Sequence, residues 1–251
     1  MDLGLAGRAC VVTGASRGIG LATADLLEQE GAKVLRVARR LDHPGGLEAD
    51  VTDADAGERI VSECVERFGS IDVLVNNAGT SRVAGLDELS DGDWREQLDL
   101  HVMGPMRLMR AAAPRMAERG WGRIVNVCSS SGKRPSLSNA AYSVSKAAQL
   151  SLSRVFADTY ADRGVLVNAV APGPVETPLW LAEGGLAEQA AAAKGTSREE
   201  ALEAARSKIP IGRFGTEEEI AAVIAFLCSA RASDVVGAAW SVDGGSVPTI
   251  V

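Results

Sequence analysis

The sequence has only two histidines, His43 and His101, and only four cysteines in 251 residues. Metal sites in proteins are usually built from clustered histidine, cysteine and carboxylate ligands. No two of the cysteines are close in sequence, so we predict neither a metal site nor a disulfide framework. We expect mostly buried, reduced thiols at Cys10, Cys64, Cys128 and Cys228.

The sequence also lacks a basic segment followed by an apolar run at its start, and no window approaches the length of a membrane span. We therefore expect a cytoplasmic protein without a membrane partner. The formal net charge of -7 makes a nucleic-acid partner unexpected, because phosphates repel an acidic surface. Hydrophobic residues make up 46% and charged residues 24%, which is typical of a globular protein with a large core.

Short apolar runs alternate with longer helical stretches along almost the whole chain. This alternation predicts a parallel sheet with helices on both faces, a Rossmann-type, doubly wound α/β fold. No linker rich in proline or serine interrupts it, so 1–251 is expected to be a single domain. Strands are expected at 9–13, 34–37, 73–75, 124–127, 167–170 and 240–242, and helices at 18–30, 54–68, 91–118, 140–163 and 216–229.

Two segments depart from the alternation. The stretch 39–50 leaves little room for a helix and is interrupted by Pro44-Gly45-Gly46. The stretch 174–209 contains prolines and glycines followed by an Ala/Glu-rich helical run. A long insertion after a strand is a candidate lid, so we predict that 174–209 covers a substrate site. Residues near 130–139 are expected to line the same pocket. Leu179, Trp180 and Leu181 indicate either an apolar lid or contacts to the core or within a tetramer.

A glycine-rich loop follows the first expected strand, and a helix follows the loop. It reads Thr13-Gly14-Ala15-Ser16-Arg17-Gly18-Ile19-Gly20. Glycines allow a tight turn and close approach to a pyrophosphate, and the helix presents its N-terminal amides to that charge. The spacing is G-x-x-x-G-x-G, and the strand-loop-helix context favours a dinucleotide site over a simple turn.

The end of the second strand decides between the two nicotinamide dinucleotides. A carboxylate there binds the ribose 2′-hydroxyl of NAD, whereas arginine accepts the 2′-phosphate of NADP. This chain has Arg39 and Arg40 at that point, and Arg17 lies in the glycine loop. Guanidinium groups suit phosphate, so NADP(H) is favoured over NAD(H), although the arginines could also be solvated surface charges.

Tyr142 and Lys146 are four residues apart in a predicted helix and therefore share one face. An ammonium beside a phenol stabilises the phenolate and lowers its pKa, which suits the phenol to proton transfer at a carbonyl. Such a pair is common by chance, but Ser129 follows a predicted strand thirteen residues earlier. Ligands of such folds bind at the carboxyl ends of strands, where this serine can donate to a substrate oxygen.

Taken in order, the motifs resemble those of the short-chain dehydrogenases/reductases. They are Thr13-Gly14-x-x-x-Gly18-Ile19-Gly20, Asn76-Asn77-Ala78-Gly79, Ser129, Tyr142-x-x-x-Lys146, Pro172-Gly173 and Val242-Asp243-Gly244-Gly245. Together they cover almost the whole chain. The resemblance implies that Ser129 holds the substrate oxygen, Tyr142 transfers the proton and Lys146 also binds the nicotinamide ribose.

The resemblance also implies further cofactor contacts and an assembly. Asn77, Ala78 and Gly79 would line the cofactor, and Asp50 and Val51 would flank the adenine. Pro172, Gly173, Val175 and Thr177 would contact the nicotinamide end. Family members of this length imply a homotetramer or a homodimer, built through the helices near 91–118 and 140–163.

His101 departs from the family pattern, which usually has asparagine at this position. In the family that asparagine's backbone carbonyl holds a water that passes protons to the lysine. A backbone carbonyl survives a side-chain change, so the resemblance implies that activity persists. His101 could relay protons itself, because its unperturbed pKa is about 6.5, or it could be a packed helix histidine.

These features favour an NADP(H)-dependent oxidoreductase that reduces a ketone to a secondary alcohol. The resemblance makes a β-ketoacyl thioester the first substrate class, followed by a secondary-metabolite or hydroxysteroid-like ketone. One alternative is an NAD-dependent alcohol or diol dehydrogenase. Another is a non-catalytic NADP-binding sensor, which the replacement at His101 suggests and the intact Ser129, Tyr142 and Lys146 oppose.

Overall fold

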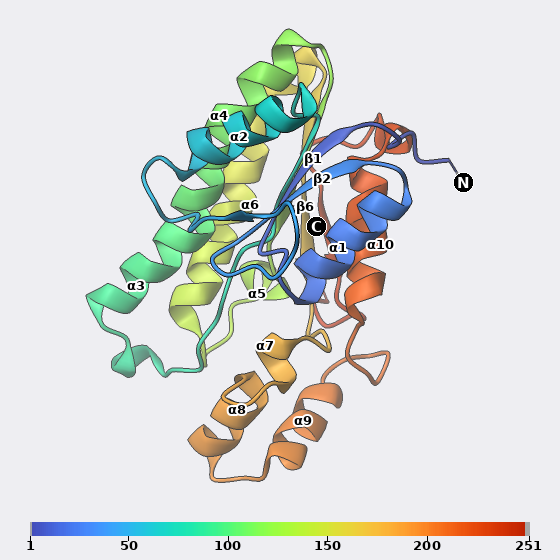
Figure 1. The fold of residues 1–251 in the computed structure, drawn as a ribbon. Coiled ribbons are helices and arrows are strands. Elements are labelled where there is room, and N and C mark those ends of the chain that lie inside the picture. Colours follow the sequence, from blue (N-terminus) through green and yellow to red (C-terminus); the bar gives the residue numbers. More distant parts are fainter. Residues whose placement is uncertain (1, 249–251) are drawn as a thin grey trace.

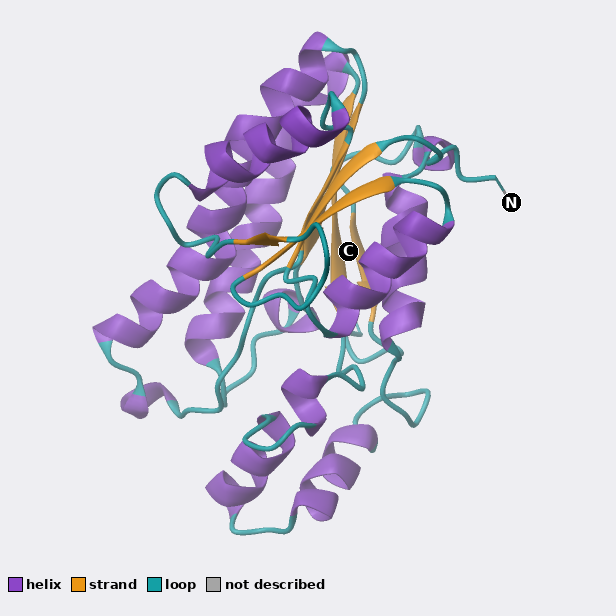
Figure 2. Cartoon of the chain, viewed as in Figure 1, coloured by secondary structure: helices purple, strands orange, loops and turns teal. Residues whose placement is uncertain are grey.

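The computed structural model, which describes residues 2–248, is built around one seven-stranded parallel sheet (Figures 1 and 2). The strand order is β3-β2-β1-β4-β5-β6-β7. The strands are β1 (Ala9–Thr13), β2 (Lys33–Ala38), β3 (Leu47–Glu48), β4 (Val73–Asn76), β5 (Gly122–Val127), β6 (Val165–Pro172) and β7 (Ala239–Val242). The predicted single-domain doubly wound fold is confirmed.

Helices cover both faces of the sheet (Figure 1). One face carries α1 (Gly18–Gln29) and α10 (Glu217–Cys228). The other carries α2 (Ala56–Phe68), α4 (Gly104–Glu118) and α6 (Ala140–Tyr160), with α3 (Asp91–Leu98) leading into α4. The predicted helices therefore form close to their predicted bounds.

The strands form because apolar side chains alternate between two buried faces. Val11, Leu74 and Ile124 pack into the core beneath α2, α4 and α6, whereas Val12 and Val75 pack into the core beneath α1 and α10. A pleated strand sends successive side chains to opposite faces, so a parallel strand covered on both sides reads as a continuous apolar run. The four cysteines are buried free thiols, as the sequence predicted.

Three local elements differ from the prediction. The two-residue strand β3 pairs with β2 at the sheet edge, in the segment that was too short for a helix. A π-helical turn, Asp99–Met103, interrupts the single helix expected over 91–118. The four-residue helix α5 (Ser130–Lys133) follows β5, and the Ser129 hydroxyl accepts the backbone N–H of Ser131 at its start. These elements are too short for periodicity to reveal.

The segment predicted as a lid folds into three short helices that lie beyond the end of the sheet (Figure 1). They are α7 (Pro178–Leu181), α8 (Leu186–Lys194) and α9 (Arg198–Arg206). They enclose a small core of their own around Phe214 and Leu202, and Trp180 packs edge-on against Phe214. Gln189 of α8 accepts a hydrogen bond from the backbone N–H of Val83. The segment is therefore joined to the loop that follows β4.

Across residues 2–248, no helix combines the length and the apolar character that crossing a bilayer requires.

The sheet reverses its winding between β1 and β4. From β1 the chain moves to β2 on one side and returns to β4 on the other. The loops leaving β1 and β4 therefore diverge and open a crevice at the carboxyl edge of the sheet, where ligands of such folds bind.

Candidate active site

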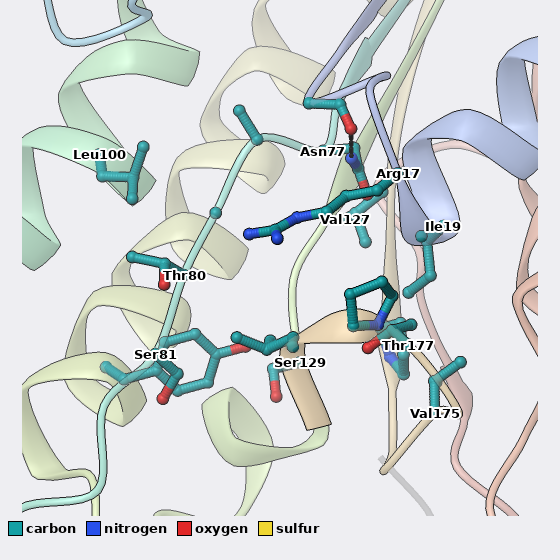
Figure 3. Close-up of a pocket in the computed structure, with 18 of the residues that line it drawn as sticks. Arg17, Ile19, Asn77, Thr80, Ser81, Leu100, Val127, Ser129, Val175 and Thr177 are labelled. Atoms are coloured by element: carbon teal, nitrogen blue, oxygen red, sulfur yellow. Dashed lines mark hydrogen bonds between the residues drawn. The ribbon is translucent and has the colours of Figure 1, made fainter. Parts of the chain in front are cut away.

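A cavity of about 990 Å³ lies at this carboxyl edge. Figure 3 shows Arg17 and Ile19 on one side of it, Asn77 and Thr80 along another, and Ser129 near Thr177 at the far end. Nearly all the site residues predicted from sequence line it: Gly14, Ser16, Arg17, Gly18, Ile19, Arg39, Arg40, Asp50, Val51, Asn77, Ala78, Gly79, Ser129, Tyr142, Lys146, Pro172, Gly173, Val175 and Thr177. Two do not, Gly20 and His101, and both lie behind the lining.

The glycine loop is held against the loop that follows β4. A Cβ on Gly14 would lie 2.9 Å from the Ala78 Cα, and a Cβ on Gly20 would lie 2.3 Å from the Gly14 carbonyl oxygen. Gly18 has a φ of +64°, in the left-handed region that favours glycine. Gly20 thus shapes the loop from behind, which explains why it is absent from the cavity wall.

Hydrogen bonds fix this contact at the switch point. The Thr13 hydroxyl accepts the backbone N–H groups of Asn77, at 3.0 Å, and Ala78, at 3.1 Å. The Asn77 side-chain amide donates to the Thr13 and Gly14 carbonyl oxygens, at 2.9 and 3.3 Å. Thr13 was quoted in the sequence motif without a role of its own. The structure shows that its hydroxyl links β1 to the segment after β4.

Three arginines surround one end of the cavity. Arg17, Arg39 and Arg40 are exposed and line it, and within residues 2–248 none of them makes a hydrogen bond or ion pair to a carboxylate. Arg36, three residues earlier, instead is buried and bonded to Asp25 and Glu28. The guanidinium groups at the cavity are thus available to an anion, whereas Arg36 belongs to the packing of α1 on β2.

Asp50 stands near these arginines at the end of β3. Burial raises the pKa of this carboxyl, but hydrogen bonds from the Thr52 backbone N–H and hydroxyl, together with the charge of Arg39, outweigh it and leave the pKa lowered. Both Thr52 bonds end on Asp50 Oδ1, at 2.9 and 2.7 Å. Asp50 is therefore ionised and fixed in place at neutral pH.

The lining fits a dinucleotide with a phosphorylated ribose. The glycine loop places its backbone where a side chain would collide. Helix α1 begins at Gly18, with its N-terminal amides at the cavity. The guanidinium groups of Arg39 and Arg40 lie beside the end of β2. A planar fork of donors matches phosphate geometry. The donor chemistry present thus suits two separate phosphate positions.

Tyr142 projects from the first turn of α6 toward Ser129, on the loop after β5. Burial raises the pKa of Tyr142 to about 12, although a hydrogen bond with Ser129 opposes this rise. In the protein alone the pKa of this phenol is therefore raised and not lowered as expected, because burial dominates. The ammonium nitrogen lies 5.7 Å from the Tyr142 ring centroid and is hydrogen-bonded elsewhere.

Lys146 lies one turn along α6 and is 3% exposed. Its Nζ donates to the Val127 carbonyl oxygen at 2.9 Å and to Gln149 Oε1 at 2.9 Å. Burial lowers the pKa of Lys146 to about 8. The side chain therefore carries a charge at neutral pH and loses it as the pH rises through about 8.

His101 is fully buried in the π-helical turn, behind the cavity wall. The backbone N–H of Thr80 donates to its Nε2 at 3.4 Å, and its Nδ1 lies 3.0 Å from the Ser145 hydroxyl. That hydroxyl donates to the Tyr142 carbonyl oxygen, so Nδ1 carries the hydrogen. Burial, and then the charge of Lys146, hold the pKa of His101 well below its usual range. His101 is therefore neutral, with both nitrogens bonded to protein.

Sequence reasoning left several lining residues without a role. They lack a motif, and only the fold brings them to the cavity: Val37, Ala38, Ala49, Thr52, Thr80, Ser81, Glu96, Leu100, Val127 and Cys128. Ser130 and Asn139 lie in the 130–139 stretch that was expected to line the substrate pocket. Trp180 and Leu179 bring apolar surface from α7 to the same pocket, whereas Leu181 packs into the core of that segment.

Comparisons with known proteins agree with this geometry. A family model described as Enoyl-(Acyl carrier protein) reductase matches residues 6–247. The 3-oxoacyl-[acyl-carrier-protein] reductase of Thermotoga maritima is 37% identical, over 97% of this chain and 99% of its own. Cis-4-hydroxycyclohexanecarboxylate dehydrogenase of Sinomonas cyclohexanicum is 40% identical, over 98% of each chain.

A solved structure is similar over the full length of both chains. It is the L-sorbose reductase of Gluconobacter frateurii complexed with NADPH and L-sorbose, with a TM-score of 0.92 and 34% identity. The family match, the relatives and this likeness confirm the resemblance that the ordered motifs gave. The chain belongs to the short-chain dehydrogenase/reductase family and is an oxidoreductase.

Proposed function

We propose that this protein reduces a ketone to a secondary alcohol with NADPH, with Tyr142 as the proton donor. One observation carries this proposal: Ser129, Tyr142 and Lys146 line the same cavity as the glycine loop and the three arginines. The relatives support it, because the names of two of them describe reductases, and one is complexed with NADPH and a ketose. A β-ketoacyl thioester and a small hydroxylated ketone are the leading substrate classes.

The bound cofactor supplies the hydride that reaches the carbonyl carbon. Arg17, Arg39 and Arg40 would hold the 2′-phosphate, the amides of the glycine loop and α1 the pyrophosphate, and Lys146 the nicotinamide ribose. The other predicted contacts, from Asp50 and Val51 at the adenine to Pro172 and Thr177 at the nicotinamide, belong to the same proposal. NAD(H) is the alternative cofactor.

Tyr142 and Ser129 act on the substrate oxygen. The Ser129 hydroxyl donates to the carbonyl oxygen and orients it beside the Tyr142 phenol. As negative charge develops on that oxygen, the phenol gives up its proton and the alcohol forms. A pKa of about 12 keeps the phenol protonated at neutral pH, so it holds the proton that reduction of the carbonyl consumes. The Lys146 ammonium stabilises the phenolate that remains.

The first experiment follows NADPH oxidation with a carbonyl panel that includes an acetoacetyl thioester, a ketose and a cyclic ketone. We expect turnover, and a 10²- to 10⁴-fold loss of kcat in Tyr142→Phe, about the usual contribution of a general acid.

Trp180→Ala, in the segment proposed as a lid, should raise KM for the preferred substrate more than it lowers kcat, because Trp180 contacts substrate and not the transferred proton.

The outcomes of this assay separate the candidate functions. Turnover that survives Tyr142→Phe would contradict the assigned proton donor. Tight NADPH binding with no turnover across the panel would favour the non-catalytic sensor. Faster oxidation of secondary alcohols with NAD than with NADP would favour the dehydrogenase, the activity named in the Sinomonas relative.

The proposed preference for NADP(H) has its own test. Arg39→Ala combined with Arg40→Ala removes two phosphate donors, so KM for NADPH should rise roughly tenfold or more. KM for NADH should change little, because NADH has no 2′-phosphate. Arg95→Ala, an exposed arginine on α3, controls for the lost charge. An equal rise in KM for NADPH and for NADH would mean that the two arginines do not bind the 2′-phosphate.

We propose that His101 is a clamp and not a proton relay. Its imidazole joins the Thr80 backbone, in the loop after β4, to Ser145 on the catalytic helix. A relay needs a ring nitrogen free to accept and release protons near neutral pH. Both nitrogens have protein partners here, and the charged form is disfavoured.

His101→Asn tests the clamp. We expect the pH–rate profile to keep its shape and the free energy of unfolding to fall by about 1 kcal/mol, the scale of one hydrogen bond. Urea unfolding and kcat/KM between pH 5 and 9 measure the two quantities. A limb of the profile that moves only in this variant would restore the relay.

We also propose a homotetramer or homodimer, formed through the helices near 91–118 and 140–163. Leu98 and Met103 are 37% and 36% exposed beside α4, and Val144 and Val155 are 48% and 58% exposed on α6. Figure 1 shows these helices side by side. Exposed apolar side chains gathered on neighbouring helices are typical of an interface.

Buried thiols support the cytoplasmic location predicted from sequence, which cell fractionation tests.

Light scattering of the purified chain measures the assembly directly. We expect a mass of two or four chains, and a smaller assembly in Val155→Glu, because a charge would be buried at the contact. Leu137→Glu is the matched control, since Leu137 is 93% exposed and lies outside both helices. A monomeric wild-type protein would contradict the proposal.

A further inference from the structure

Gln149 is a buried polar side chain beside the active site that the motifs do not include. It lies on the inward face of α6 and is 1% exposed. Its Oε1 accepts a hydrogen bond from Lys146 Nζ at 2.9 Å. Gln149 does not line the cavity, so it reaches the reaction only through Lys146.

An ammonium group has three N–H donors and no acceptor. When it is buried, each donor without a partner adds to the cost of keeping the charge out of water. In Lys146, one donor is bonded to the Val127 carbonyl oxygen and a second to Gln149. The third remains for the ribose hydroxyls of the dinucleotide. The Val127 oxygen belongs to the backbone, so Gln149 is the acceptor that a substitution can remove.

The titratable groups that face Lys146 come from three elements. Cys128 follows β5, and burial raises the pKa of its thiol to about 12. Tyr142 lies one turn earlier on α6, and His101 lies in the π-helical turn. All three are neutral at pH 7, since burial raises the pKa of Tyr142 to about 12 and lowers that of His101. The charge of Lys146 therefore depends on uncharged acceptors.

We propose that Gln149 is a positioning residue that holds the Lys146 ammonium charged at the wall of the cavity. A neutral amide can do this without taking the proton and without cancelling the positive charge. The inference rests on the proposed function, in which Lys146 acts as an ammonium. Removal of the Gln149 acceptor should therefore change how activity depends on pH.

The test compares Gln149→Met, which keeps the length of the side chain but removes the acceptor, with Gln149→Glu, which adds a negative charge. The measured quantity is the alkaline limb of kcat/KM for ketone reduction, expected near pH 8 in the wild type. Loss of the acceptor should move this limb down by about one pH unit, and the carboxylate should move it up by a similar amount. The Kd of NADPH, measured by NADPH fluorescence, should rise over the same pH range, because Lys146 loses its charge there.

Ser153→Ala is the matched control for loss of a buried polar group on this helix. Ser153 is one turn beyond Gln149, is 3% exposed and accepts a hydrogen bond from Asn126. Ser153 does not touch Lys146, so the alkaline limb of kcat/KM in Ser153→Ala should stay at its wild-type pH. A limb that stays near the wild-type pH in both Gln149 variants, with thermal stability lowered as in Ser153→Ala, would overturn the positioning role.

A failure of the proposed function would look different. In that case the wild-type protein would show no Tyr142-dependent turnover. The fluorescence titration would still test Gln149, because it measures NADPH binding without catalysis. A pH dependence of the NADPH Kd that is identical in wild type, Gln149→Met and Gln149→Glu would overturn the inference by itself.

Discussion

The architecture of the site depends on the contact between the loops that leave β1 and β4. Thr13 and Asn77 hold these loops together through four hydrogen bonds between side chain and backbone. The contact leaves no room for a Cβ at Gly14, whose neighbour across the crevice is the Ala78 backbone. The winding of the sheet reverses between β1 and β4. The two loops therefore diverge beyond this contact and leave a crevice between them. The glycine loop and α6 then face one cavity.

Much of this arrangement could be predicted from the sequence. Continuous apolar runs such as 9–13 and 124–127 identify buried parallel strands, and motifs at strand ends must meet at one edge of the sheet. The unpredicted features depend on contacts between distant segments. The bond from Lys146 to Gln149 follows local helix spacing, but its burial does not. The direction of the pKa shift at Tyr142 likewise follows from the burial of Tyr142 itself. The π-helical turn also had no periodic signal.

The inward face of α6 carries an unusual number of polar side chains for a buried surface. Several meet partners outside the helix: Ser145 meets His101, Lys146 meets the Val127 carbonyl oxygen of β5, and Ser153 meets Asn126. Asn126 in turn accepts from Asn76 in the adjacent strand. Buried polar groups are costly unless they are hydrogen-bonded, so these pairs fix the rotation and height of the helix against the sheet. A helix held by apolar contacts alone could slide with less penalty.

This way of fixing α6 explains why the partners of Lys146 are neutral. A carboxylate beside the ammonium would raise its pKa, but it would also cancel its field at the place where a substrate oxygen gains negative charge. A carbonyl and an amide leave that field intact, and the cost is a pKa of about 8. At neutral pH the group is still charged, and Tyr142 still holds its proton. The buried surroundings thus set both groups in the protonation states that the proposed reduction requires.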